Sequence, residues 1–192
     1  MVLEDIFKIF SFFKSFCRMN IRSLKFREKM MLEKNVFIGR NVLIDPGYNW
    51  LISIGDNSVL SYGTIVLAHD GSLRNYTGYT KVGKVTIGSN TFIGAGSIIM
   101  PGVTIGDNVI IGAGSVVTKN IPDNSVAAGN PAVVIGSVPE LIKKHKSNMN
   151  LFPVYETMPK QNALDKELQN GFAYIRTYSE KDIISIENVN EK

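Results

Sequence analysis

The sequence predicts a mainly β protein whose central part is a parallel β-helix. Within residues 87–117 an aliphatic side chain recurs at every sixth position. A period of six fits neither the 3.6-residue turn of an α-helix nor the alternation of a flat strand, but it is typical of coils built from short strands and tight turns. Glycine, asparagine and aspartate occupy the positions between, where such turns need them. The aliphatic positions are Ile87, Ile93, Ile99, Ile105, Ile111 and Val117.

The predicted β-helix covers residues 35–138 and has two interruptions. The pattern begins at Ile38, loses register near residues 46–50 and resumes at Ile54. The spacing from Val66 to Ile87 is longer than three six-residue units, and residues 70–84 are polar and rich in glycine. We therefore expect residues 70–84 to form a loop that protrudes from one corner of the coil. Loops carried on a rigid scaffold are frequent places for function.

Helical segments are expected at both ends of the coil. Residues 1–34 form an N-terminal amphipathic segment, in which residues 3–31 show helical spacing with a wide apolar face. A partner subunit, the open end of the coil or a membrane surface could cover that face. Residues 139–192 form a C-terminal cap and tail, with a helix that starts near Pro139. Within this tail, residues 164–174 are expected to be helical and residues 182–189 to form a strand.

Composition limits the class of protein. Cys17 is the only cysteine, so neither an intrachain disulfide nor a thiolate metal cluster is expected. Apolar runs fall short of the roughly 18 residues that cross a bilayer. The net charge of +4 comes from basic residues near the two ends, which are compatible with an anionic membrane surface or with solvated helix faces. We expect a cytoplasmic protein, with peripheral membrane contact through the N-terminal helix as one option and no nucleic-acid partner.

His69 is the main candidate for acid–base chemistry. The chain has two histidines, and the other, His145, lies among lysines where a surface role suffices. His69 lies where the repeat gives way to the protruding loop, which is an exposed and rigidly held place for a general base. Asp70 follows directly, but neighbouring side chains of an extended chain point to opposite faces, so we do not expect Asp70 to orient the imidazole.

The repeats, the position of His69 and two closing motifs together resemble the hexapeptide-repeat acyltransferases. The motifs are Ile111-Gly112-Ala113-Gly114-Ser115-Val116-Val117-Thr118-Lys119 and Gly129-Asn130-Pro131-Ala132. The resemblance covers residues 35–140 and is closest to acetyl-CoA-dependent O-acetyltransferases of sugars and surface polysaccharides. It implies a homotrimer of left-handed β-helices, an exception to the right-handed crossover rule. It also implies acetyl-CoA as co-substrate in a groove between subunits, and no metal.

The resemblance assigns roles to several residues. His69 would deprotonate the acceptor hydroxyl, and the backbone N–H of Ala95 would stabilise the negative charge on the attacked carbonyl. The other implied cofactor contacts are Gly96, Ala113, Gly114, Thr118 and Lys119. Relatives often carry basic residues after the second motif, where this chain has Val133-Val134-Ile135-Gly136. Phosphate contacts would therefore come from Lys119 or from the pair Lys143 and Lys144.

Aromatic, amide and charged side chains near the two interruptions are candidates for the acceptor site, because they suit the faces and hydroxyls of a carbohydrate. They are Asp45, Asn49, Trp50, Arg74, Asn75, Tyr76 and Tyr79. The same base and cofactor site would also serve N-acetylation of an amino sugar, or acetylation of serine or an antibiotic. A γ-type carbonic anhydrase shares the coil but needs three zinc-binding histidines. A β-helix with a purely structural or binding role is the non-enzymatic alternative.

Overall fold

The computed structural model describes residues 31–157 and 174–175. The chain divides into two compact units, residues 1–135 and 136–192. Most of the expected N-terminal helix and the expected strand at residues 182–189 lie outside the described residues, as does the expected helix at residues 164–174 up to residue 173. Its last residue, Tyr174, lies in a strand instead. Residues 31–34, expected in the N-terminal helical segment, instead open the coil with a strand at Met31–Leu32.

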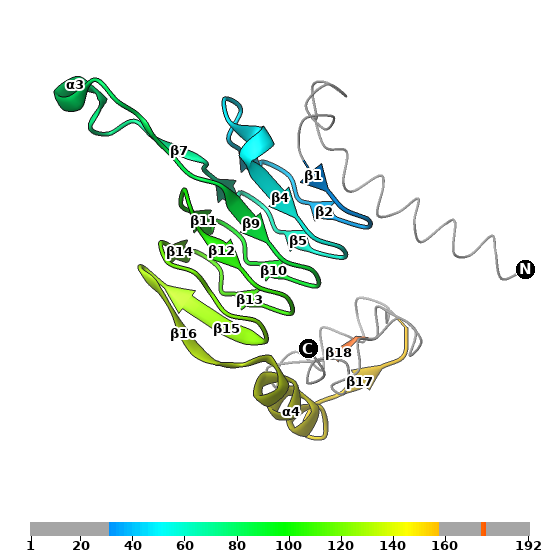
Figure 1. The fold of residues 1–192 in the computed structure, drawn as a ribbon. Coiled ribbons are helices and arrows are strands. Elements are labelled where there is room, and N and C mark those ends of the chain that lie inside the picture. Colours follow the sequence, from blue (N-terminus) through cyan, green and yellow to red (C-terminus); the bar gives the residue numbers. More distant parts are fainter. Residues whose placement is uncertain (1–30, 158–173, 176–192) are drawn as a thin grey trace, which may run out of the picture. The chain divides into compact units, whose positions relative to one another are not determined.

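The first unit is a parallel β-helix with three faces, named here sheets A, B and C (Figure 1). The chain passes from A to B to C in successive coils, so the strands of neighbouring coils pair in parallel. The last two strands of sheet B are the exception, because they follow each other directly in the chain. Sheet A contains β1 (Met31–Leu32), β4 (Ile52–Ile54), β9 (Val85–Ile87) and β12 (Thr104–Ile105). Sheet B contains β2 (Phe37–Ile38), β5 (Val59–Leu60), β10 (Phe92–Ile93), β13 (Ile110–Ile111), β15 (Ser125–Gly129) and β16 (Ala132–Ser137). Sheet C contains β3 (Leu43–Ile44), β6 (Ile65–Val66), β11 (Ile98–Ile99) and β14 (Val116–Val117).

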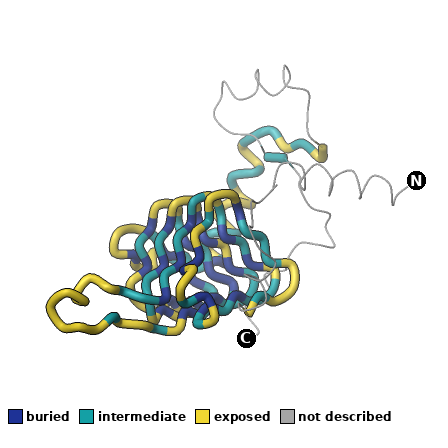
Figure 2. Tube along the Cα trace, turned by 90° about the horizontal axis from the view of Figure 1, so that it is seen from above, coloured by how far each residue is buried: buried dark blue, intermediate teal, exposed yellow. Residues whose placement is uncertain are grey.

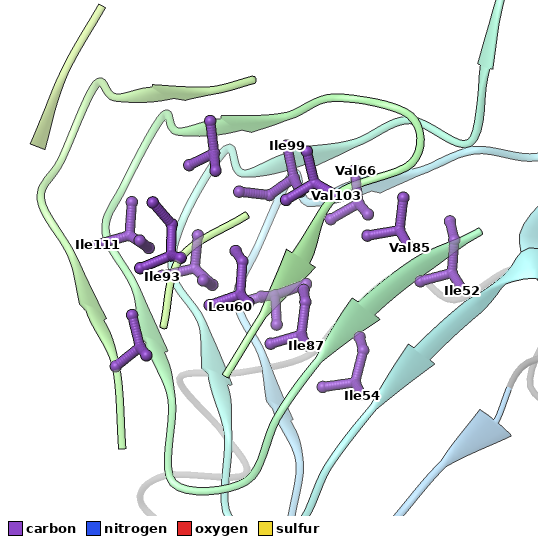
Figure 3. Packing of buried hydrophobic residues seen from close by; sticks show 14 of the residues in the cluster. Ile52, Ile54, Leu60, Val66, Val85, Ile87, Ile93, Ile99, Val103 and Ile111 are labelled. Atoms are coloured by element: carbon purple, nitrogen blue, oxygen red, sulfur yellow. The ribbon is translucent and has the colours of Figure 1, made fainter. Parts of the chain in front are cut away.

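The predicted aliphatic columns form the core of this unit. All six predicted positions are buried, with side chains exposed by 1% or less. Figure 3 shows side chains of this core, with Ile87, Ile93, Ile99 and Ile111 among them, pointing into one shared interior. Burying an aliphatic side chain of this size contributes about 1.5–3 kcal/mol, so the repeated column is the main source of stability. The predicted left-handed parallel β-helix is confirmed.

Two of the three corners are tight turns in which a left-handed backbone recurs. At the corner between sheets A and B, asparagines with φ of 54–58° stack in a ladder. Each amide donates to the asparagine of the next coil, over 3.0–3.3 Å. At the corner between sheets B and C, glycines take the corresponding place, with φ of 67–68° at Gly63, Gly96 and Gly114. Asparagine and glycine tolerate this conformation better than other residues.

The corner between sheets C and A carries both interruptions of the repeat. The shorter one contains the 3₁₀-helix η1 (Asn49–Leu51). The longer one is an arm, in which β7 (His69–Asp70) pairs antiparallel with β8 (Lys81–Val82) and α3 (Arg74–Thr77) forms the tip. Figures 1 and 2 show the arm extending away from the coil as an exposed hairpin. The protruding loop expected over residues 70–84 is thus present.

The second unit contains the helix α4 (Val138–Met149), which begins close to the expected start at Pro139. Ser137 and Glu140 form a capping box: the Ser137 hydroxyl accepts from the Glu140 N–H, and the Glu140 carboxylate accepts from the Ser137 N–H. The hydrogen bonds with Ser137 lower the pKa of Glu140. A short pair, β17 (Val154–Tyr155) with β18 (Tyr174–Ile175), follows. Among the described residues, no helix is long and apolar enough to cross a membrane.

Candidate active site

A buried carboxylate organises the corner between sheets C and A. Asp45 directly follows β3 and its side chain is fully buried. Its Oδ1 accepts hydrogen bonds from the N–H groups of Gly47, at 3.0 Å, and Tyr48, at 3.2 Å. Its Oδ2 accepts from the N–H of Ala68, at 3.0 Å, and is hydrogen-bonded to Nδ1 of His69. One side chain therefore connects two segments: the shorter interruption, called here the short insertion, and the start of the arm.

The charge of Asp45 determines which nitrogen of His69 carries the proton. Burial by itself would raise the pKa of this carboxyl, but the hydrogen bonds from His69, Ala68 and Gly47 outweigh it and hold the pKa below the usual 3.8. An ionised carboxylate only accepts hydrogen bonds, so Nδ1 of His69 is the donor. Nε2 then carries the lone pair of the neutral ring. Because 38% of the His69 side chain is exposed, the imidazole is accessible to a hydroxyl group from solution.

One aromatic ring lies beside this histidine, and a second ring lies beside the first. The ring of Tyr48 is 4.9 Å from the imidazole and that of Trp50 is 5.5 Å from Tyr48, centroid to centroid. Tyr48 is partly buried, whereas Trp50 is 52% exposed. The short insertion thus presents an aromatic surface next to the candidate base. Tyr48 was missing from the sequence-based candidates, although its position between Asp45 and Trp50 was a signal for it.

The expected acceptor residues do not all lie together. Asp45 and Asn49 are buried rather than open to a ligand, and the Asp45 oxygens are occupied by protein donors. We therefore correct the expectation that Asp45 contacts the acceptor, because its place is behind the imidazole. The remaining candidates on the arm are exposed and lie on α3 or just beyond it (Figure 1). They are Arg74, Asn75, Tyr76 and Tyr79.

The expected cofactor residues fall at two corners. Ala95, Gly96, Ala113 and Gly114 are exposed at the corner between sheets B and C, where the Gly114 N–H donates to the Ala95 carbonyl at 2.8 Å. These small residues make a shallow strip along the coil. Thr118 and Lys119 follow β14 and are exposed. They lie at the corner between sheets C and A, which is also the corner of His69.

His69 and Ala95 cannot act on the same carbonyl within one chain. They lie at opposite ends of sheet C, since Ala95 precedes β11 and His69 follows the paired strand β6. The intervening six or seven residues of extended chain span roughly 20 Å. Reacting atoms need to approach to about 3–3.5 Å. Within the described ranges, no cluster of three or more histidine, cysteine, aspartate or glutamate side chains has the arrangement of a metal site.

Comparison with known proteins agrees with the repeat architecture. Residues 84–119 match the family described as bacterial transferase hexapeptide (six repeats), and residues 31–68 match the hexapeptide repeat of succinyl-transferase. YvoF of Bacillus subtilis (strain 168), whose name assigns it to the acetyltransferases, is 34% identical over 120 residues, which are 62% of this chain and 67% of YvoF. Protein CapG of Staphylococcus aureus is 47% identical over 93 residues, 46% of this chain and 54% of CapG.

Among solved structures, a maltose O-acetyltransferase from Clostridium difficile 630 has 32% sequence identity and a TM-score of 0.46, covering 68% of this chain and 84% of that one. The chain spans about two thirds of the length of YvoF and about half of the length of CapG. Of the two family matches, one includes Ala95 and the other ends one residue before His69. The chain belongs to the hexapeptide-repeat acyltransferase family.

Proposed function

We propose that this protein transfers an acetyl group from acetyl-CoA to a hydroxyl of a sugar or surface polysaccharide. The observation that carries the proposal is the pair formed by His69 and the buried Asp45 carboxylate at an exposed corner of the coil. An alcohol is a poor nucleophile at neutral pH, so its attack on a thioester benefits from a base whose lone pair is held in place. Asp45 supplies this orientation and compensates the charge of the imidazolium that forms.

The reaction follows from these roles. Nε2 of His69 takes the proton of the acceptor hydroxyl while the hydroxyl oxygen attacks the thioester carbon. The carbonyl oxygen becomes negative, and we assign the backbone N–H of Ala95 as its hydrogen-bond donor. The carbon–sulfur bond then breaks, the acetyl ester is formed, and the leaving thiolate takes the proton from the imidazolium. General-base assistance contributes about 10²–10⁴-fold, and one oxyanion donor about 10²–10³-fold.

The separation of His69 from Ala95 favours a site shared between copies. In this arrangement His69 of one copy meets the strip of Ala95 and Ala113 on the next. Thr118 and Lys119 lie at the same corner as His69, so they would face the same neighbour and reach the nucleotide end of the cofactor. The small side chains of this strip leave room for an extended pantetheine close to the backbone.

The outer faces of the coil support a homotrimer. The outward side chains of sheets B and C are apolar and in register, whereas those of sheet A are mostly serine and threonine. A member of a cyclic trimer contacts two neighbours through two different surfaces, so two apolar faces are what closure requires. The outward residues are Phe37, Val59, Phe92, Ile110 and Val126 on sheet B, and Leu43, Ile65, Ile98 and Val116 on sheet C.

The acceptor would bind over the aromatic rings of Tyr48 and Trp50. A pyranose ring has apolar C–H faces and polar edges, so the exposed indole of Trp50, next to the tyrosine that contacts the base, suits it. The aromatic contact places one hydroxyl edge toward His69. N-acetylation of an amino sugar, or acetylation of serine or an antibiotic, would use the same base and donor, so the acceptor assay distinguishes these reactions.

The test is thiol release from acetyl-CoA with a panel of neutral sugars, amino sugars and serine. We expect release with hydroxyl acceptors, a fall of about 10²–10⁴-fold in His69→Ala, and no change in His145→Ala, which removes the histidine of α4. Undiminished turnover in His69→Ala would refute the role of this base. Release only with amines would reassign the reaction to N-acetylation. A wild-type protein that binds no coenzyme A would exclude the donor and the proposed function with it.

A further inference from the structure

The strip of small residues between sheets B and C ends at an aromatic side chain. The outward positions at this corner are, in coil order, Arg40, Tyr62, Ala95 and Ala113. Backbone hydrogen bonds show that they stack: the Gly63 N–H donates to the Arg40 carbonyl at 3.0 Å, and the Gly96 N–H donates to the Tyr62 carbonyl at 2.8 Å. Neighbouring coils are spaced as in any sheet, by about 4.8 Å.

The change in side-chain size along this column is abrupt. Ala113 and Ala95 offer only methyl groups, whereas the next coil carries the phenol of Tyr62, which is 44% exposed. The turn that follows has its φ of 68° at Gly63, so the backbone bends at the glycine and Tyr62 is free to present its side chain outward. A ligand that extends along the alanines therefore meets a wall one coil beyond Ala95.

We propose that Tyr62 sets the acyl-chain length of the donor. This inference rests on the proposed function, in which the thioester carbonyl lies at Ala95 and the pantetheine runs past Ala113. An acyl chain leaves its carbonyl on the side opposite the sulfur, so it continues along the column toward the Tyr62 coil. The methyl group of an acetyl fits before that coil. Each further methylene is forced against the phenol ring.

The test compares acetyl-, propionyl- and butyryl-CoA as donors for the wild-type protein and for Tyr62→Ala. A single methylene in a closed pocket changes specificity by about 10–200-fold. We expect the wild-type kcat/KM to fall by at least about tenfold from acetyl- to propionyl-CoA, and most of this preference to vanish in Tyr62→Ala. Tyr62→Phe is the matched control, because it keeps the ring and should keep the preference. Tyr62→Leu, which replaces the phenol by a smaller apolar side chain, should admit propionyl-CoA.

Dissociation constants for the three thioesters, measured by calorimetry, separate this inference from the proposed function. If Tyr62→Ala and Tyr62→Leu fold and bind coenzyme A but retain the wild-type preference for acetyl, the inference is wrong while the acetyltransferase proposal stands. If Tyr62→Phe also loses the preference, the hydroxyl and not the size of the ring is responsible, and the wall is refuted. If the wild-type protein binds none of the thioesters, the proposed function itself fails.

Discussion

Replacing Asp45 by asparagine tests the centre of the candidate site. The carboxylate accepts four hydrogen bonds, two on each oxygen. An amide of the same shape offers one oxygen and one NH₂ group. In either orientation, NH₂ must therefore face donors that the carboxylate had satisfied. The two orientations have different consequences.

If the amide oxygen keeps Gly47 and Tyr48, the NH₂ group faces Ala68 and His69. The buried Ala68 N–H then loses its acceptor, which costs about 1–3 kcal/mol of folding stability. Nδ1 of His69 must become an acceptor, so the proton moves to Nε2 and the ring can no longer take a proton there. We expect kcat to fall by up to the full contribution of a general base, about 10²–10⁴-fold.

If the amide instead turns its oxygen toward His69, the histidine keeps its tautomer, but the N–H groups of the exposed Gly47 and the partly buried Tyr48 lose their acceptor. Because water can replace the acceptor at Gly47, the stability loss is then about 1–3 kcal/mol, with a smaller effect on kcat. Thiol-release kinetics, urea unfolding and ¹⁵N shifts of the imidazole distinguish these cases. Asp70→Asn is the control, because the Asp70 carboxylate bonds the Ser72 N–H. An Asp45→Asn protein with wild-type kcat and wild-type stability would refute the assigned hydrogen bonds.

The stability difference between the wild-type protein and Asp45→Asn should depend on pH with a defined sign. The pKa of Asp45 is lowered in the folded protein. The ionised carboxylate therefore stabilises the fold at any pH above 3.8, the ordinary pKa of the group. The contribution is lost as the pH falls through the lowered folded-state pKa. The stability gap between the wild-type protein and Asp45→Asn should therefore be constant near neutral pH and narrow in strong acid.

Three further changes test the acceptor site, the assembly and the coil. Trp50→Ala should raise the acceptor KM roughly 2–12-fold, as expected for 0.5–1.5 kcal/mol of aromatic contact, and leave the KM of acetyl-CoA unchanged in initial-rate kinetics. Phe92→Glu on sheet B should dissociate the assembly in light scattering coupled to size exclusion, whereas Thr104→Glu on sheet A should not. Gly94→Ala would place a Cβ 2.5 Å from a backbone nitrogen of the next coil, a clash that should cost about 1–3 kcal/mol of unfolding free energy. Gly71→Ala, whose Cβ would lie 3.8 Å from its nearest neighbour, should cost far less.

The regular part of the fold could be predicted because its physical cause is local and repeated. Each inward aliphatic residue from Ile87 to Val117 meets the same requirement, namely that one side chain per strand fills the interior. The start of the coil was placed too late, at residue 35 instead of Met31, because β1 is only two residues long and carries no turn signal before it. Leu32 nevertheless packs against the core, and its register with Ile54 explains why the coil extends this far.

The candidate base could be predicted, but its partner could not be recognised by counting along the chain. Asp45 and His69 are far apart in sequence, and the insertions that contain them break the six-residue period. Placing Asp45 beside His69 requires the strand register of sheet C, in which Ile44 pairs with Val66. Residues that follow these two strands stack at one corner, so Asp45 could have been placed beside the start of the arm. The aliphatic pattern alone contained this pairing, since both residues are inward positions.

The location of the chemistry follows from how a β-helix accommodates extra residues. An insertion within a strand would shift every later side chain to the wrong face, whereas an insertion at a corner leaves the ladder intact. Both insertions of this coil lie at the corner between sheets C and A, on adjacent coils. The first supplies Asp45 and the aromatic rings, and the second supplies His69. Breaks in the period therefore mark the places where this fold can hold a reactive group, and two breaks at one corner provide both the base and the carboxylate that orients it.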